Sequence, residues 1–244
     1  MSARRTTAAI LMVISMSSTA AAASGPSGLT TIAEQSGNRR TGRYEEVQRL
    51  CPAFEKAWPK QVRCFEFGRS PEGRPMLALA ASGDGVLDAA GARRAQRPVV
   101  LMQGGIHAGE IDGKDAGFLA LREMLEGKVA KSALAGATLV FVPVLNVDGH
   151  ERFGRWNRPN QVGPEEMGWR TTAHNLNLNR DYVKAEAPEM QAICGSSTSG
   201  TRSCMSTCTS RTAPSSSTTF LTASRRRWRA TTSCGAPAWR CATS

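Results

Sequence analysis

Two side chains that could bind a metal ion, His107 and Glu110, lie three residues apart in the segment 104–110. This segment directly follows the apolar run 98–102, which has the pattern of a buried strand. An imidazole and a carboxylate on a turn at the carboxyl end of a strand can converge on one cation, and zinc accepts such mixed donors. The pattern is short, and the alternative is a solvated turn in which Glu110 is an ordinary surface residue.

Further blocks that could do chemistry follow the next apolar run, 138–144. They are Asn146-Val147-Asp148-Gly149, Asn157-Arg158-Pro159-Asn160, Gly168-Trp169-Arg170 and Asn175-Leu176-Asn177-Leu178-Asn179-Arg180-Asp181-Tyr182. A guanidinium presents a planar fork suited to a carboxylate, and a fixed cation beside a developing oxyanion lowers the reaction barrier. The arginines of these blocks, Arg170 and Arg180 among them, could make such a contact or an ordinary surface salt bridge.

In this order the blocks are similar to those of the zinc carboxypeptidases, and the resemblance covers roughly residues 40–193. It implies that His107 and Glu110 are two of three protein ligands to Zn²⁺. It also implies that Arg170 polarises the scissile carbonyl, and that Asn179 and Arg180 bind the terminal carboxylate of a peptide with a free C-terminus.

The activity that the resemblance implies is zinc-dependent removal of C-terminal residues from peptides. Position 109 is Gly, where the animal digestive enzymes have Arg. The sequence therefore does not decide between proteins, peptides and cell-wall peptides as substrates. Two alternatives remain: an amidohydrolase acting on N-acyl amino acids, and a non-catalytic module in which Asn179 and Arg180 bind carboxylates without hydrolysis.

Half of the expected site is missing from this sequence. The family takes its third ligand from a histidine on a later strand and its general base from a later glutamate, but no His follows Asn179 and no Glu follows Glu189. His150 and His174 could be proposed as the third ligand, but we expect both to be ordinary surface histidines.

The elements that would position these residues follow from apolar periodicity. Residues 44–58 have helical spacing, with Val47, Leu50, Phe54 and Trp58 on one face. Residues 62–67 and 76–81 predict a hairpin around a Pro/Gly turn, and 83–97 predict a loop. The strand 98–102, a helix over 115–125 and the strand 138–144 form a βαβ unit. We expect an α/β fold with a mixed, largely parallel sheet flanked by helices, and with the C-terminal part of the family's domain missing.

The chain divides into a signal peptide (1–23), a polar leader (24–40), a partial carboxypeptidase domain (41–193) and an aberrant tail (194–244). Arg4 and Arg5, a short apolar run and an alanine-rich end are typical of an export signal, so we expect a secreted or periplasmic protein. A buried N-terminal helix is the alternative. No stretch is long enough to span a bilayer. Cys51 and Cys64 could form a disulfide or be isolated buried thiols.

The net charge of +11 does not indicate nucleic-acid binding, because it is concentrated in the tail. Residues 195–244 hold 7 Arg and no acid; removing them from the chain's 31 basic residues leaves 24 against 20 acidic ones. Aromatic residues do not alternate with basic ones in the body of the chain, so no nucleic-acid partner is expected. The sequence does not predict an oligomeric state.

The tail has 23 Ser or Thr among its last 50 residues and no apolar periodicity, which favours a disordered segment. A frameshift near Cys194 is the more specific hypothesis. Read from the third base of each codon, Cys208-Thr209 can give only His or Tyr, and 204–214 can become Tyr-Val-Asp-Leu-His-Val-Thr-Asp-Gly-Ala. That is a strand ending in a histidine, which is the element that the family requires here.

Overall fold

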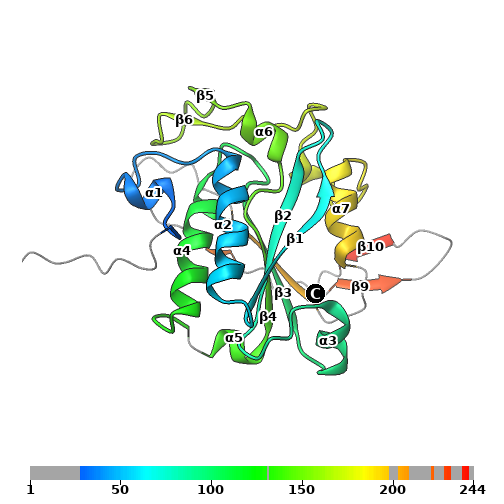
Figure 1. Cartoon of the computed structure of the whole chain (residues 1–244). Helices are drawn as coiled ribbons and strands as arrows, with labels where there is room; N and C mark the ends of the chain where they lie inside the picture. The colour runs from blue at the N-terminus through cyan, green and yellow to red at the C-terminus, as the bar shows by residue number, and fades with distance from the viewer. Residues whose placement is uncertain are drawn as a thin grey trace, which may run out of the picture.

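The computed structural model describes residues 28–130, 132–197, 203–208, 221–222, 228–231 and 238–241. The expected signal peptide, 1–23, lies outside these ranges. The described residues form a mixed sheet with strand order β1-β2-β4-β3-β7-β8, and helices cover both of its faces (Figure 1). The main strands are β1 (Val62–Arg69), β2 (Pro75–Ala81), β3 (Val99–Gln103), β4 (Thr138–Val142), β7 (Ser203–Cys208) and β8 (Leu221–Thr222). The expected α/β class with a mixed sheet flanked by helices is confirmed.

The helices are α1 (Ile32–Gln35), α2 (Tyr44–Ala57), α3 (Ala89–Arg94), α4 (Asp112–Leu125), α5 (Ala133–Gly136), α6 (Val147–Glu151), the 3₁₀ helix η1 (Leu178–Arg180) and α7 (Pro188–Ser197). Two short strand pairs lie outside the main sheet: β5 (Gly154–Arg155) with β6 (Glu166–Met167), and β9 (Trp228–Thr231) with β10 (Ala238–Cys241). Among the described residues, no helix has the length and apolar character needed to cross a membrane.

The pairing of the strands confirms the predicted hairpin and the predicted βαβ unit. β1 pairs antiparallel with β2, and β2 pairs antiparallel with β4. In the middle of the sheet β3 lies parallel to both β4 and β7, with α4 as the crossover between β3 and β4. Parallel neighbours end at the same edge of a sheet, so the segments that follow β3 and β4 emerge side by side.

Alternate residues of the strands pack into two cores, one on each face of the sheet. On one face Leu79 and Phe141 contact the apolar sides of α2 and α4, where the Phe118 ring lies 5.6 Å from Phe54 and 5.3 Å from Phe141 between centroids. On the other face Ala78 and Val142 contact Met190 and Ile193 of α7. Figure 1 shows α2 and α4 on one side of the sheet and α7 on the other.

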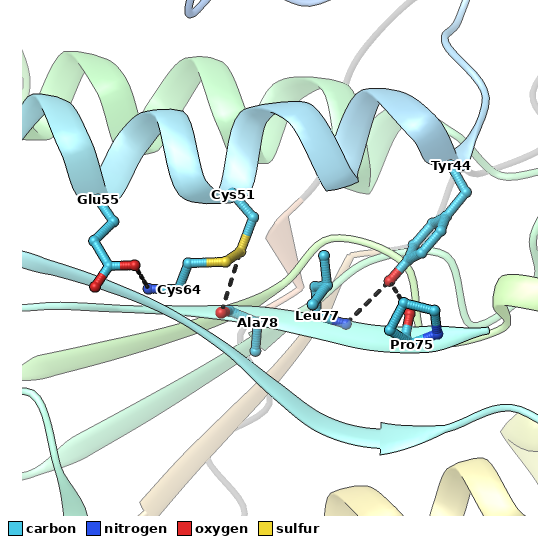
Figure 2. Close-up of a disulfide and its surroundings, with 7 residues drawn as sticks. All are labelled: Tyr44, Cys51, Glu55, Cys64, Pro75, Leu77 and Ala78. Atoms are coloured by element: carbon cyan, nitrogen blue, oxygen red, sulfur yellow. Dashed lines mark hydrogen bonds between the residues drawn. A yellow bond between two sulfur atoms is a disulfide. The ribbon is translucent and has the colours of Figure 1, made fainter. Parts of the chain in front are cut away.

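The predicted apolar face of α2 is confirmed, since Val47, Leu50 and Phe54 are fully buried. A disulfide joins Cys51 on α2 to Cys64 on β1 (Figure 2), which answers the question that the sequence left open. Near the start of α2, the Tyr44 hydroxyl donates to the Pro75 carbonyl at 2.8 Å and accepts from the Leu77 N–H at 3.0 Å. The helix is therefore attached to the hairpin at two places.

The part of the expected polar leader that the structure describes, 28–40, packs on the domain. Thr31 caps α1 in a capping box with Glu34, and Glu34 also pairs with Arg122 of α4. Buried Lys114 of α4 donates to two groups that follow the leader in sequence, the Gly42 carbonyl and the Glu46 carboxylate, each at 2.7 Å. These contacts attach the N-terminal segment to the helix that follows the candidate metal ligands.

Several elements were not predicted from the sequence, and two of them show why. The expected loop 83–97 contains α3, which Asp88 caps by accepting from the Gly91 N–H. The expected disordered tail contains β7, whose backbone pairs with β3. A strand edge offers unpaired N–H and C=O groups that any backbone can satisfy, so pairing there does not require an apolar pattern in the added strand.

Candidate metal centre

His107 and Glu110 lie on the turn that leaves the carboxyl end of β3. Gly104 and Gly105 make this turn possible, because Gly105 has a φ of +58° and a Cβ on Gly104 would come within 2.6 Å of the Pro143 carbonyl. The turn closes with a hydrogen bond from the Glu110 N–H to the His107 carbonyl at 2.9 Å. Both side chains are buried, with 4% and 5% of their surfaces exposed, so Glu110 is not the solvated residue of the alternative interpretation.

The hydrogen bonds of His107 determine which of its ring nitrogens can bind a cation. Nε2 lies 3.1 Å from Asn177 Oδ1, and that oxygen also accepts from the Asn179 N–H at 3.1 Å. An oxygen facing a backbone N–H is an acceptor, so Nε2 must donate to it. In the neutral ring, Nδ1 then carries a lone pair, and it faces Glu110 Oε1 at 3.0 Å. Two acceptors at this distance need a shared cation, either a proton or a metal ion.

Glu110 is held as a carboxylate within reach of two guanidinium groups. Arg158 Nη2 donates to Glu110 Oε1 at 2.8 Å, and Arg170 Nη1 lies 3.8 Å from the same oxygen. Burial raises the pKa of Glu110. When the cation shared with His107 is a proton, the hydrogen bond and charge of His107, together with the charge of Arg158, outweigh the effect of burial, so the pKa lies below its ordinary value. Glu110 Oε2 is buried and has no hydrogen-bond partner among the described residues.

These features fit a divalent metal ion such as zinc. The donor types are imidazole nitrogen and carboxylate oxygen, and Asn177 supplies the outer hydrogen bond that orients a ligating histidine. Among the described residues, however, no group of three or more His, Cys, Asp or Glu side chains is placed to hold a metal ion.

The structure brings Arg170 to this centre but does not bring Arg180 to it. Arg170 is fixed through its backbone, because its carbonyl accepts from Asn146 Nδ2 at 3.2 Å and the preceding Trp169 N–H donates to the Gly149 carbonyl. Its side chain is 42% exposed, so it can reach both Glu110 and a bound molecule. Arg180 is exposed and donates to the neighbouring Asn179 carbonyl, while Asn179 is half-buried.

The Asn146-Val147-Asp148-Gly149 block supports the site without entering it. Asn146 caps α6 by accepting from the Gly149 N–H at 2.9 Å. Asp148 is fully buried and accepts from the Ser70 hydroxyl and from Arg74, each at 2.6 Å. The block therefore connects the turn of the β1–β2 hairpin to the backbone that carries Arg170.

His150 is not a surface histidine, and that prediction was wrong. Only 1% of it is exposed, because Gly168 packs directly on its backbone and its ring lies 6.0 Å from the Phe153 ring. Gly168 is eighteen residues away, so the local sequence does not reveal this contact. His174 is exposed, as predicted.

We expect His150 to make the protein less stable in mild acid. Burial lowers its pKa, and the positive charge of Lys114 lowers it further, while Glu151 and Glu46 act in the opposite direction. The unfolded chain therefore gains a proton near pH 6.5 while the folded chain does not, so the free energy of unfolding falls as the pH drops below about 6.5. The slope is at most about 1.4 kcal/mol per pH unit.

Urea unfolding of the parent and of His150→Gln between pH 7 and pH 5 tests this. The variant should lose less stability over that range than the parent, whereas His174→Gln, at an exposed position, should behave as the parent does. Equal pH slopes for the parent and His150→Gln would contradict the prediction.

Two contacts of the centre were not predicted from the sequence: the bond from Arg158 to Glu110 and the bond from His107 to Asn177. Arg158 stands in a recognised block, but nothing local indicates that a residue 48 positions away lies against Glu110. Asn177 stands two residues before the Asn179-Arg180 pair, and that proximity was the available signal.

Comparisons with known proteins point to one family. The family model described as zinc carboxypeptidase matches residues 47–224, which extends beyond residue 193 into the tail. The chain is 30% identical over 146 residues to carboxypeptidase D of Drosophila melanogaster, covering 57% of this chain but only 10% of that protein. The chain thus spans about a tenth of the length of this curated relative.

One solved structure shows the same fold, and a second superposes less closely. Thrombin-activatable fibrinolysis inhibitor superposes with a TM-score of 0.50 at 18% identity, covering 67% of this chain and 47% of that one. A metallo-carboxypeptidase from Burkholderia cenocepacia is 24% identical with a TM-score of 0.49, covering 67% and 40%. Because the family model matches well over half of the sequence, the chain belongs to the zinc carboxypeptidase family.

Proposed function

We propose that this chain derives from an exported zinc carboxypeptidase that removes C-terminal residues from peptides. His107 and Glu110 are two of its metal ligands. The observation that carries the proposal is the pair of facing acceptors, His107 Nδ1 and Glu110 Oε1, 3.0 Å apart and next to the partnerless, buried Glu110 Oε2. The Cys51–Cys64 disulfide supports export, because disulfides persist in oxidising compartments.

Each remaining residue has a role that its position supports. Arg170, partly exposed beside Glu110, stabilises the oxyanion that forms from the scissile carbonyl. Arg180, with Asn179, binds the terminal carboxylate of the peptide, because its exposed guanidinium makes one hydrogen bond, to the Asn179 carbonyl, and has further N–H groups for a paired contact. When bound, zinc would lower the pKa of a water molecule and polarise the carbonyl.

We further propose that the tail results from a shift of the reading frame near Cys194. β7 lies parallel to β3, with Thr207 opposite Gln103. Its carboxyl end at Cys208 therefore lies at the edge of the sheet where the turn that carries His107 and Glu110, called the ligand turn below, begins. The shifted reading puts a histidine at the junction of Cys208 and Thr209. The position of β7 therefore supports the hypothesis that this strand carries the third ligand in the parent enzyme.

Zinc binding by the 244-residue chain tests the proposed centre. We expect weak binding in a chelator competition assay, because each missing donor removes a bond and preorganisation. His107→Ala and Glu110→Gln should each abolish it, while His174→Ala, at an exposed position, should leave it unchanged. Binding that survives loss of either ligand would place the metal elsewhere and overturn the assignment.

Two rival functions give different results. An amidohydrolase would prefer N-acyl amino acids to peptides when a frame-corrected chain is profiled against both. A non-catalytic module would bind peptides with a free C-terminus, in the presence of chelator, through Asn179 and Arg180.

A further inference from the structure

The segment that joins β5 to β6 is folded over the ligand turn. Gln161 Nε2 donates to the Gly109 carbonyl at 3.2 Å, and Arg158 Nη2 donates to Glu110 Oε1 at 2.8 Å. Arg158 is 8% exposed, which is rare for an arginine and shows that its guanidinium is directed into the protein. One buried cation thus lies against the candidate ligand carboxylate.

Gly109 is what allows Arg158 to reach this position. A Cβ on residue 109 would come within 2.7 Å of Arg158 Cγ and within 2.6 Å of the Gly168 carbonyl. Side chains with a Cβ therefore cannot occupy position 109 unless both Arg158 and the Gly168 backbone move. The glycine between the two candidate ligands and the arginine that crosses over it form one packing unit.

We propose that Arg158 is a positioning residue for the metal site: it fixes Glu110 through Oε1 so that Oε2 is presented to a divalent cation. The inference rests on the proposed zinc site and adds to it a residue with no assigned role.

The charges and contacts around Glu110 favour this role for Arg158 over Arg170. Arg158 is buried and within hydrogen-bond distance, whereas Arg170 is 3.8 Å away and 42% exposed, which leaves it available for substrate. A buried carboxylate without a cationic partner is costly, and arginine is always charged. Without Arg158, Glu110 would be free to rotate, and this rotation would remove a metal donor from the site.

The test is the affinity of the 244-residue chain for Zn²⁺, measured by chelator competition at neutral pH. Arg158→Gln should weaken binding by about 10- to 100-fold, the range seen when an outer-shell partner of a ligand is lost. Arg158→Lys should weaken binding less than Arg158→Gln does, because lysine keeps the positive charge but lacks the planar guanidinium. Gly109→Ala should act in the same direction as Arg158→Gln by displacing the arginine.

The matched control is Arg155→Gln, an exposed arginine on the same segment that pairs with Glu165, and it should leave the affinity unchanged. Thermal melts of all variants separate a local effect from unfolding; if Arg158→Gln does not fold, Arg158→Lys and Gly109→Ala carry the test. Unchanged binding in a folded Arg158→Gln overturns this inference alone, and so does tighter binding, which would show that the arginine competes with the metal. A parent chain that binds no Zn²⁺ overturns the proposed site and this inference together.

Discussion

A chain read in the corrected frame, and continued downstream until it includes the general-base glutamate, is expected to release C-terminal residues from peptides, whereas the 244-residue chain should show no measurable activity. The sequence supplies two candidate metal ligands, and catalytic zinc sites normally have three protein donors. It also has no glutamate after Glu189 to act as the general base, and losing a general base alone costs about 10²- to 10⁴-fold in rate. The missing third ligand and the missing general base both slow the hydrolysis of the peptide bond, so we expect their combined effect on the rate to be larger than any other effect predicted for this chain.

The measurement compares both purified proteins on peptides with free and amidated C-termini, with and without chelator. The control is a frame-corrected chain in which the codon spanning Cys208 and Thr209 encodes glutamine; it should retain the fold and lose the activity. Resequencing the DNA for residues 192–195 should show a one-base slip. A confirmed frame, together with chelator-sensitive hydrolysis by the 244-residue chain, would refute this account of the site.

Removing the disulfide is expected to lower the free energy of unfolding by about 3 kcal/mol, since the Cys51–Cys64 bond closes a loop with a sequence separation of 13. The bond constrains the unfolded chain, and it also fastens α2 to the edge strand of the sheet. The double substitution Cys51→Ala with Cys64→Ala should show the full effect in urea, and reduction of the parent should give a similar loss.

Cys194→Ala is the matched control, because Cys194 is a half-buried free thiol outside this contact. It should change stability much less than the double substitution. If the oxidised parent and the double variant unfold at the same urea concentration, the disulfide does not contribute to stability.

The parts of the fold that apolar periodicity encodes were predictable. The amphipathic face of α2 and the apolar run of β4 carry their burial in the local sequence. The apolar run of β3 was expected to be buried as well, but Val99 to Met102 are only half-buried. α3 has no such local signal, since 89–94 reads Ala-Ala-Gly-Ala-Arg-Arg and has no apolar stripe. β7 was missed because its residues have no apolar pattern either, and its place in the sheet comes from backbone pairing with β3.

The ligand turn was predictable because its residues are close in sequence, and its surroundings were not. His107 and Glu110 lie on one turn, so their spacing alone brings them together. Arg158 and Asn177 reach them only after the sheet and the later loops have folded. The burial of His150 likewise depends on Gly168, which comes from another segment.

The place of β3 between β4 and β7 has a consequence for synthesis on the ribosome. Val99 pairs with Thr138 on one side and with Ser203 on the other, about 100 residues later in the chain. A nascent chain that has emerged only as far as β4 therefore exposes the backbone edge of the very strand that leads to His107. Such an edge is a template for pairing with other chains and a target for chaperones. Translational pausing between the codons for β4 and β7 should accordingly lengthen the period in which this protein is prone to aggregate.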